Sequence, residues 1–259
     1  MPAYFILVFL FGLIIGSFLN CFIWRLHKKI PLTPFVKGGD KWKRSYCPKC
    51  GKQIAWHDNV PILSFILLAG KCRHCKKPIS WQYPAVELAT GLLFAAAYYF
   101  NQELTVRLAR DWFLISAMIV IFIYDLRWYL ILDIITLPAC LVMLIFNLIL
   151  GFDLWNLLIS GIIGGSFFLI QFVISKGKWI GGGDIRLGLL IGLSFGWPGV
   201  LAAIIISYFI GSIIGISLVL ARKKEFGSQM PLGVFLAAGA IIILFWQDNI
   251  LNWYWNLFL

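Results

Sequence analysis

The sequence predicts an all-α polytopic membrane protein with about eight transmembrane helices and a small cytoplasmic domain built on four cysteines. Three observations predict this fold class. The 259 residues are 61% hydrophobic and 13% charged, which leaves too little polar surface to cover a soluble globule. The apolar residues form continuous runs without the alternation of a membrane barrel. Two C-x-x-C pairs lie within one basic segment.

Eight apolar segments are candidate spans, because a spanning helix needs about 20 mostly apolar residues. Backbone groups in lipid are satisfied only in helices or closed barrels, so we expect these segments to be helical. The sixth segment is short, and with the seventh it could instead form a re-entrant pair. The segments are approximately 3–24, 84–100, 108–125, 130–150, 155–175, 185–197, 199–221 and 230–246.

The net charge of +11 is concentrated in one segment. Residues 25–83 contain thirteen Lys or Arg against two Asp, and the rest of the chain is neutral. Because this charge lies between two spans, the positive-inside rule puts the segment in the cytoplasm and the N-terminus outside. Twenty of the 22 Lys and Arg then lie on the cytoplasmic side. We therefore expect contact with anionic lipid and no nucleic-acid partner.

Three parts follow from this pattern: a first transmembrane helix at 1–24, a zinc-binding domain at 25–83 and a multi-helix membrane domain at 84–259. In the first part, we expect Gly16, Ser17 and Asn20 to serve helix packing, with Asn20 able to hydrogen-bond another helix.

The four cysteines of the loop resemble the ligands of a structural zinc site. The motifs Cys47-Pro48-Lys49-Cys50 and Cys72-Arg73-His74-Cys75 are separated by 21 residues. Stable disulfides are disfavoured in the cytoplasm, and four thiolates around a tetrahedral zinc would cross-link a loop too polar to build its own core. We interpret Cys47, Cys50, Cys72 and Cys75 as zinc ligands, with a redox dithiol or disulfides as the alternatives.

A run of three glycines, Gly181 to Gly183, delivers Asp184 to the start of an apolar helical segment. Glycine lets a backbone bend sharply and lets another chain approach closely. An ionisable side chain in or beside a span is a functional candidate. Asp is also a good N-cap, so Asp184 could simply start the helix.

Asp125 ends the third predicted span on the same side as Asp184. Two carboxylates that meet in a low-dielectric site cannot both ionise easily, so one keeps a proton and the pair can act as base and acid on one water. The sequence therefore indicates an aspartate dyad. An ion pair with Arg127 is the alternative for Asp125, and Asp133 is an alternative dyad member that we rank below Asp125.

Glu87 lies just inside the cytoplasmic boundary of the second predicted span. An acid in the first turn of a helix is favoured by the helix dipole. We therefore interpret Glu87 as a first-turn acid in preference to a catalytic group.

Taken in order, these segments resemble the bifunctional type IV prepilin peptidases, which are membrane aspartyl proteases of the GxGD kind. Two departures do not remove a carboxylate: Leu132 stands where the family usually has Pro, and Arg186 where it often has Lys. The matching segments are Gly16 to Asn20 with Arg25-Leu26, Cys47 to Cys50, Asn59 to Ser64, Gly70 to Cys72 with Cys75, Ile79-Ser80, Tyr83 to Leu88, Asp125 to Arg127 with Asp133, and Gly181 to Asp184.

The resemblance implies that Asp125 and Asp184 are catalytic. It implies cleavage of a short basic leader from type IV prepilins or pseudopilins after a Gly, at the cytoplasmic face of a bacterial inner membrane, in the service of pili, secretion or competence (DNA uptake). It also implies N-methylation of the new N-terminal residue, commonly Phe, with S-adenosylmethionine as donor. The family's methyl transfer is associated with the positions of Gly70 and Lys71.

Two alternatives from other classes stay open. One is a GxGD intramembrane protease without methyltransferase activity. The other is a membrane transporter or scaffold whose structural zinc knuckle docks a partner.

Overall fold

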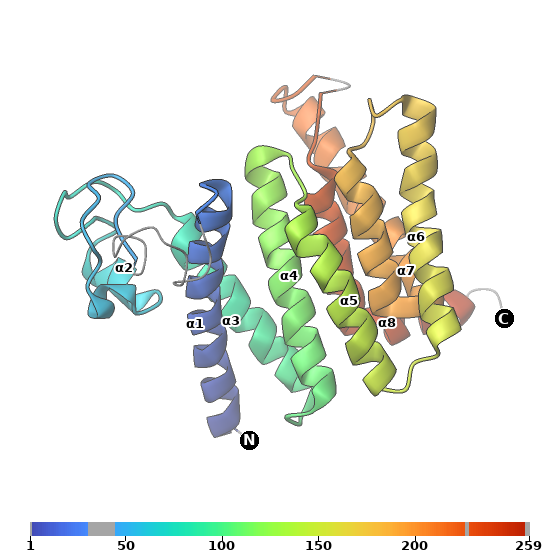
Figure 1. Cartoon of the computed structure of the whole chain (residues 1–259), viewed down its shortest axis with the longest axis horizontal. Coiled ribbons are helices and arrows are strands. Elements are labelled where there is room, and N and C mark those ends of the chain that lie inside the picture. Colours follow the sequence, from blue (N-terminus) through green and yellow to red (C-terminus); the bar gives the residue numbers. More distant parts are fainter. Residues whose placement is uncertain (1, 31–44, 226–227, 257–259) are drawn as a thin grey trace. The chain divides into compact units, whose positions relative to one another are not determined.

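The computed structural model describes residues 2–30, 45–225 and 228–256, so part of the expected cytoplasmic loop, 31–44, lies outside the described residues. Its contacts form two units, unit 1 (Met1–Gln102) and unit 2 (Glu103–Leu259). Figure 1 labels the α-helices of both units. The elements are α1 (Pro2–His27), the 3-10 helix η2 (Trp56–Asn59), α2 (Leu63–Leu67), α3 (Gln82–Asn101), α4 (Val106–Trp128), α5 (Asp133–Ile149), α6 (Leu154–Ser175), α7 (Gly182–Leu220) and α8 (Leu232–Asn256). The expected all-α class is confirmed.

Four helices are long and apolar enough to cross a membrane by length and composition, within the part of the chain that the structure describes. They are α1, α6, α7 and α8. The other expected spans correspond to α3, α4, the 17-residue α5 and the second half of α7. The number of eight spans therefore stays a prediction.

In unit 1, α1 and α3 pack closely through small residues. A Cβ atom on Gly12 would lie 2.8 Å from Gly91 Cα, and one on Gly16 would lie 2.7 Å from Glu87 Cα. Asn20 of α1 donates a hydrogen bond from its side chain to the main-chain oxygen of Tyr83 at 3.1 Å. These contacts group α3 with α1, although the predicted three-part division assigns residues 84–101 to the later helices.

The cysteine-bearing segment of unit 1 consists of two loops of the same design. Gly51 in the first loop and Lys76 in the second occupy equivalent positions, and both have positive φ, 69° and 58°. Isolated bridges close the loops, Tyr46 with Gln53 and Lys71 with Pro78. The shared backbone hydrogen bonds are Cys47 N–H to Lys52 O (2.9 Å), Gly51 N–H to Cys47 O (2.8 Å), Cys72 N–H to Lys77 O (2.9 Å) and Lys76 N–H to Cys72 O (2.9 Å).

In unit 2, the helix α7 reverses direction at Gly196 and Trp197, where the backbone leaves the helical conformation. Both halves of α7 pack on α6. Going along α6 from Gly161 to Phe168, the residue numbers of its contacts decrease in the first half of α7 and increase in the second half. The two halves of α7 therefore run in opposite directions. The contacts are Gly161 with Leu193, Gly164 with Gly188 and Val200, and Phe168 with Tyr208. This reversal agrees with the two segments expected at 185–197 and 199–221.

Two asparagines satisfy the backbone groups that the break in α7 leaves without helical partners. The side-chain amide of Asn147 donates to Leu193 O at 2.7 Å and to Ser194 O at 3.1 Å. Asn156 Oδ1 accepts the Trp197 N–H at 2.9 Å. Because lipid offers no alternative partners, these side chains make a broken helix tolerable in the membrane.

The close packing of α6 on α7 predicts a contrast between adjacent glycines. We expect Gly164→Ala to destabilise unit 2 by about 1–3 kcal/mol, because its Cβ would collide with the Gly188 carbonyl group. Gly165→Ala is the matched control, since its Cβ would lie 3.6 Å from the nearest atom, an ordinary contact. Thermal unfolding in detergent measures both variants. Equal midpoints for the two variants would contradict the packing described.

Candidate active site

A cavity of about 280 Å³ opens in unit 2, and both Asp125 and Asp184 line it. Three stretches of the chain form its walls: 129–131 after α4, 177–184 at the turn into α7, and 229–232 before α8. The structure therefore brings together two carboxylates that the sequence pattern predicts to form a dyad.

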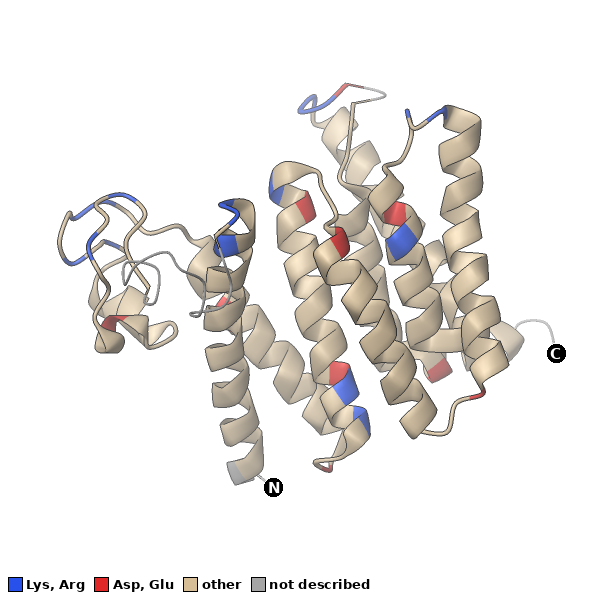
Figure 2. Ribbon diagram, in the orientation of Figure 1, with Lys and Arg blue, Asp and Glu red and all other residues tan. Residues whose placement is uncertain are grey.

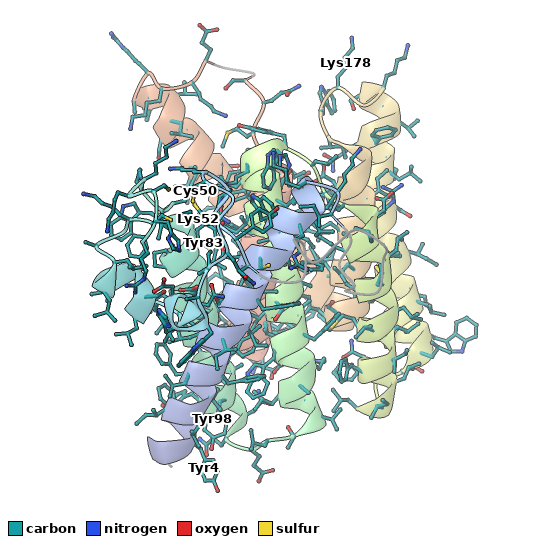
Figure 3. The ribbon with its side chains drawn as sticks, turned by 60° about the vertical axis from the view of Figure 1, so that its left-hand side comes forward. Tyr4, Cys50, Lys52, Tyr83, Tyr98 and Lys178 are labelled. Atoms are coloured by element: carbon teal, nitrogen blue, oxygen red, sulfur yellow. The ribbon has the colours of Figure 1, made fainter. Side chains whose placement is uncertain are left out.

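The cavity lies among basic turns. Lys178, in the turn between α6 and α7, lines the cavity and is labelled in Figure 3. Lys224 donates to the main-chain oxygen of Gln229 at 2.7 Å and lies over the ring of Tyr129. Figure 2 shows most Lys and Arg of unit 2 at one end of its helices, with few along their middle parts.

Asp184 is the third residue of α7, and its side chain is 6% exposed. Its Oδ2 accepts the backbone N–H of Gly181, the residue before the helix, at 2.9 Å. Asp184 thus does cap the helix, although from its third position and not as the N-cap residue itself. This bond limits rotation of the carboxylate while the side chain still borders the cavity.

Asp125 lies in the last turn of α4 and is 5% exposed. Its Oδ2 accepts the backbone N–H of Val234 at 3.2 Å, at the start of α8. A helix N-terminus favours a carboxylate through its dipole and its N–H groups. Among the described residues Asp125 has no ion pair, and the guanidinium of Arg127 lies over the Trp128 ring at 5.9 Å. The alternative of an Asp125–Arg127 pair is therefore not observed.

Asp133, the alternative dyad member, has a different environment. It forms an ion pair with Arg186, and both side chains are substantially exposed, 51% and 41%. It does not belong to the lining of the cavity that contains Asp125 and Asp184. The geometry therefore favours Asp125 as the partner of Asp184.

Of the three glycines before Asp184, Gly183 makes the close approach. A Cβ on Gly183 would lie 2.7 Å from Ile131 Cβ, closer than real Cβ atoms come to other atoms. A Cβ on Gly182 would meet nothing within 4 Å. The close approach that we expected of the three glycines is therefore made by Gly183 alone, and the segment that it approaches is the one at Ile131.

Gly233 is a further residue of the site that sequence reasoning did not single out. A Cβ there would lie 2.8 Å from Asp125 Oδ2 and 2.8 Å from Ile131 Cδ1. Because Gly233 has no Cβ, the start of α8 can come close to the Asp125 carboxylate. The available signal is weak: a Pro at 231 and a Gly at 233 where an apolar helix begins.

The four cysteines of the basic loop converge in unit 1. Their Sγ atoms all lie within 4.8 Å of one another, and those of Cys47 and Cys75 are 4.0 Å apart. Tetrahedral zinc, with Zn–S bonds of about 2.3 Å, separates its sulfurs by about 3.8 Å. No disulfide joins any of the six cysteines in this structure. The donor set fits zinc.

The backbone already favours a thiolate at Cys72, one of the four cysteines. The N–H groups of Cys75 and His74 donate to the Cys72 sulfur and lower the pKa of its thiol to about 6. A thiolate is the form that binds a metal.

Gly70 and Lys71 shape the second cysteine loop. Gly70 has a φ of +67°, its N–H donates to Phe65 O at 2.8 Å, and its oxygen accepts the Ile79 N–H at 2.7 Å. Lys71 forms the bridge with Pro78. Both residues therefore fix the conformation of the backbone directly before Cys72.

The expectation that Glu87 is a first-turn acid is wrong. Because α3 begins at Gln82, Glu87 lies in its second turn. Its Oε2 accepts the backbone N–H of Ile62, in the loop before α2, at 2.8 Å. Its partner is therefore a distant loop and not the first N–H groups of its own helix.

Two family models match the chain. Residues 10–100 match the bacterial peptidase A24 N-terminal domain, and residues 112–216 match the type IV leader peptidase family. The boundary between these matches falls near the boundary between units 1 and 2.

The chain is also similar to curated proteins named prepilin leader peptidase/N-methyltransferase. The relative from Aeromonas hydrophila is 34% identical, over 99% of this chain and 95% of the relative. That from Bacillus subtilis (strain 168) is 32% identical, over 96% of each. That from Pseudomonas aeruginosa is 31% identical, over 97% of this chain and 93% of the relative. No solved structure matches.

The convergence of four sulfurs predicts a loss of metal on substitution. We expect the double variant Cys47→Ser with Cys72→Ser to lose nearly all bound zinc, because two thiolates cannot complete a tetrahedral site. Cys21→Ala is the control, since Cys21 lies in α1 and outside the cluster. Elemental analysis of the purified proteins measures the metal. Undiminished zinc in the double variant would refute the site.

The contact between Gly233 and Asp125 predicts a loss of peptide-bond cleavage in Gly233→Ala. The added methyl group would displace either the carboxylate or the start of α8, and we expect a rate at least about 10²-fold lower. Gly165→Ala again serves as the glycine control. Cleavage of a leader-bearing substrate, followed by mass spectrometry, measures the effect. Wild-type cleavage by Gly233→Ala would rule out this role.

Proposed function

Because the chain belongs to the type IV leader peptidase family, we propose that it is a membrane aspartyl endopeptidase that cleaves the leader of type IV prepilins or pseudopilins after a Gly and N-methylates the new N-terminal residue. The shared cavity of Asp125 and Asp184 is the observation that carries the cleavage reaction. The names of the relatives support the methyl transfer.

In the proposed cleavage, one aspartate takes a proton from a water between the two carboxylates. The hydroxyl oxygen attacks the scissile carbonyl carbon, and the protonated aspartate gives its proton to the leaving amine, so the pair ends the reaction with the same number of protons. The N–H groups of Gly181 and Val234 each hold one carboxylate oxygen. They thereby reduce the reorganisation that the reaction needs.

The walls of the cavity suit an apolar peptide. Leu130, Met230, Pro231 and Leu232 contribute apolar surface beside the aspartates. The resemblance implies a substrate with an apolar segment after the cleavage site. This segment would lie along the apolar wall while its scissile bond reaches the carboxylates.

The basic turns around the cavity support a cytoplasmic location for the site. By the positive-inside rule, the end of unit 2 that carries Lys178 and Lys224 faces the cytoplasm. We propose a multi-pass protein of the bacterial inner membrane with its N-terminus outside. Contact with anionic lipid follows from the basic loop.

The proposed methyl transfer uses S-adenosylmethionine, which supplies the methyl group when bound. Zinc would hold together the two cysteine loops through Cys47, Cys50, Cys72 and Cys75. Gly70 and Lys71 would act through the conformation of the second cysteine loop. Gly70 adopts a positive φ, which residues with a side chain rarely adopt.

The dyad predicts that Asp125→Asn and Asp184→Asn each abolish cleavage, with a loss of at least about 10²-fold, because an amide cannot exchange protons with water. Mass spectrometry of a co-expressed prepilin distinguishes intact, cleaved, and cleaved and methylated chains. Full leader removal by Asp184→Asn would contradict the proposed mechanism.

Asp133→Asn is the matched control for these variants. Its ion pair with Arg186 is exposed, and such pairs contribute about 0–1 kcal/mol. We expect it to leave cleavage largely intact. An intact prepilin with the wild-type protein would favour a transporter or scaffold, and a cleaved but unmethylated one would favour a protease without methyl transfer.

A further inference from the structure

A polar cluster of two buried and two half-buried side chains in unit 1 lies outside the proposed aspartate site. It is formed by Ser17 and Asn20 of α1 and by Gln82 and Glu87 of α3, next to the turn at Ile62. Three features of this cluster are unusual for a purely structural contact.

The first unusual feature is the carboxylate of Glu87, which is 6% exposed. It accepts hydrogen bonds from the Ile62 N–H and from the Ser17 hydroxyl. Among the described residues, no Lys, Arg or His forms an ion pair with it. A buried carboxylate without a cation is costly, and it has more acceptor sites than these two donors fill.

The second unusual feature is an acceptor without a donor. Gln82 Oε1 is buried and is the one buried side-chain N or O atom without a partner in the described part of the chain. Its orientation is determined by its neighbours: Asn20 donates to Tyr83 O, which turns Asn20 Oδ1 toward the Gln82 amide group, at 3.2 Å. The oxygen of Gln82 is therefore left as an acceptor, in the same helix and five residues before Glu87.

The third unusual feature is the backbone of Ile62. Its φ of 59° and ψ of −51° describe a γ-turn, and the Leu63 N–H donates to Pro61 O across it. A positive φ is a genuine outlier for a β-branched residue. Such strain persists only where surroundings enforce it, and it clusters at functional sites. Here the Glu87 carboxylate holds the strained N–H.

Within the described residues, the cluster therefore combines a carboxylate that has no ion pair with a neutral acceptor that has no donor. The carboxylate favours a ligand that carries positive charge, and the neutral amide oxygen needs a hydrogen-bond donor. An α-ammonium group, with one charge and three donors, meets both requirements. It is also the group that peptide-bond cleavage creates on the retained part of the substrate.

We propose that Glu87 receives the new α-ammonium group of the cleaved substrate and takes its proton before methylation, an inference that rests on the proposed function. Proton transfer to Glu87 frees the nitrogen lone pair. The nitrogen then attacks the methyl carbon of the S-adenosylmethionine sulfonium, a C–N bond forms, and the C–S bond breaks to leave a neutral thioether. The methylated amine carries the positive charge that the sulfonium loses.

The test separates the charge of Glu87 from its structural hydrogen bond. Glu87→Gln keeps an oxygen that can accept the Ile62 N–H but removes the charge, whereas Glu87→Ala removes both. Glu103→Gln is the control for loss of a carboxylate, since Glu103 is exposed in the turn before α4. The full-length proteins are given a precleaved peptide with an N-terminal Phe and labelled S-adenosylmethionine, and leader cleavage of an intact prepilin is measured in parallel.

We expect Glu87→Gln and Glu87→Ala to lower peptide methylation by at least about 10²-fold, with leader cleavage and zinc content unchanged. A binding readout accompanies the rates: wild type should bind the free-amine peptide more tightly than its N-acetylated form, and Glu87→Gln should lose this preference.

Wild-type methylation by Glu87→Gln would overturn the inference, whether or not Glu87→Ala is active, because the charge would then be dispensable. Loss of cleavage together with methylation would also overturn it, because it would indicate a structural role. If the wild-type protein neither cleaves nor methylates, the proposed function itself fails.

Discussion

Ile131 packs between two glycines, and the arrangement of the aspartates depends on this contact. A side chain on Gly183 would collide with its Cβ, and one on Gly233 would collide with its Cδ1. Gly183 directly precedes Asp184, and Gly233 directly precedes the N–H that holds Asp125. One isoleucine therefore sets how closely the start of α7 and the start of α8 approach the end of α4.

The same arrangement gives each aspartate a backbone donor at a helix N-terminus. The Gly181 N–H binds Asp184, and the Val234 N–H binds Asp125. Backbone donors hold a carboxylate without adding a second titrating group or a mobile side chain. The packing of both halves of α7 on α6 fixes the position of the helix that begins beside Asp184. Asn147 and Asn156 stabilise the break between the two halves.

Much of this site could be predicted from the sequence, because its signals are short motifs and the distribution of charge along the chain. Charge asymmetry predicted that Asp125 and Asp184 lie on the same side of the membrane, and the paired C-x-x-C motifs indicated the cysteine cluster. Gly233 was missed because it acts by having no side chain, which lets the neighbouring Val234 N–H reach Asp125. Asp125 lies more than 100 positions earlier in the chain, so no local pattern links the two residues. Glu87 was misread because its donor belongs to the loop at Ile62, and no periodicity predicts that a loop will fold back onto a helix.

The central claim is that Asp125 and Asp184 face one cavity, and cross-linking tests it most directly. The double variant Asp125→Cys with Asp184→Cys, treated in membranes with a short bifunctional thiol reagent, should give a linked pair of peptides detectable by mass spectrometry. The pair Asp133→Cys with Asp184→Cys should give little of this product. A linked 133–184 pair without a 125–184 pair would contradict the account.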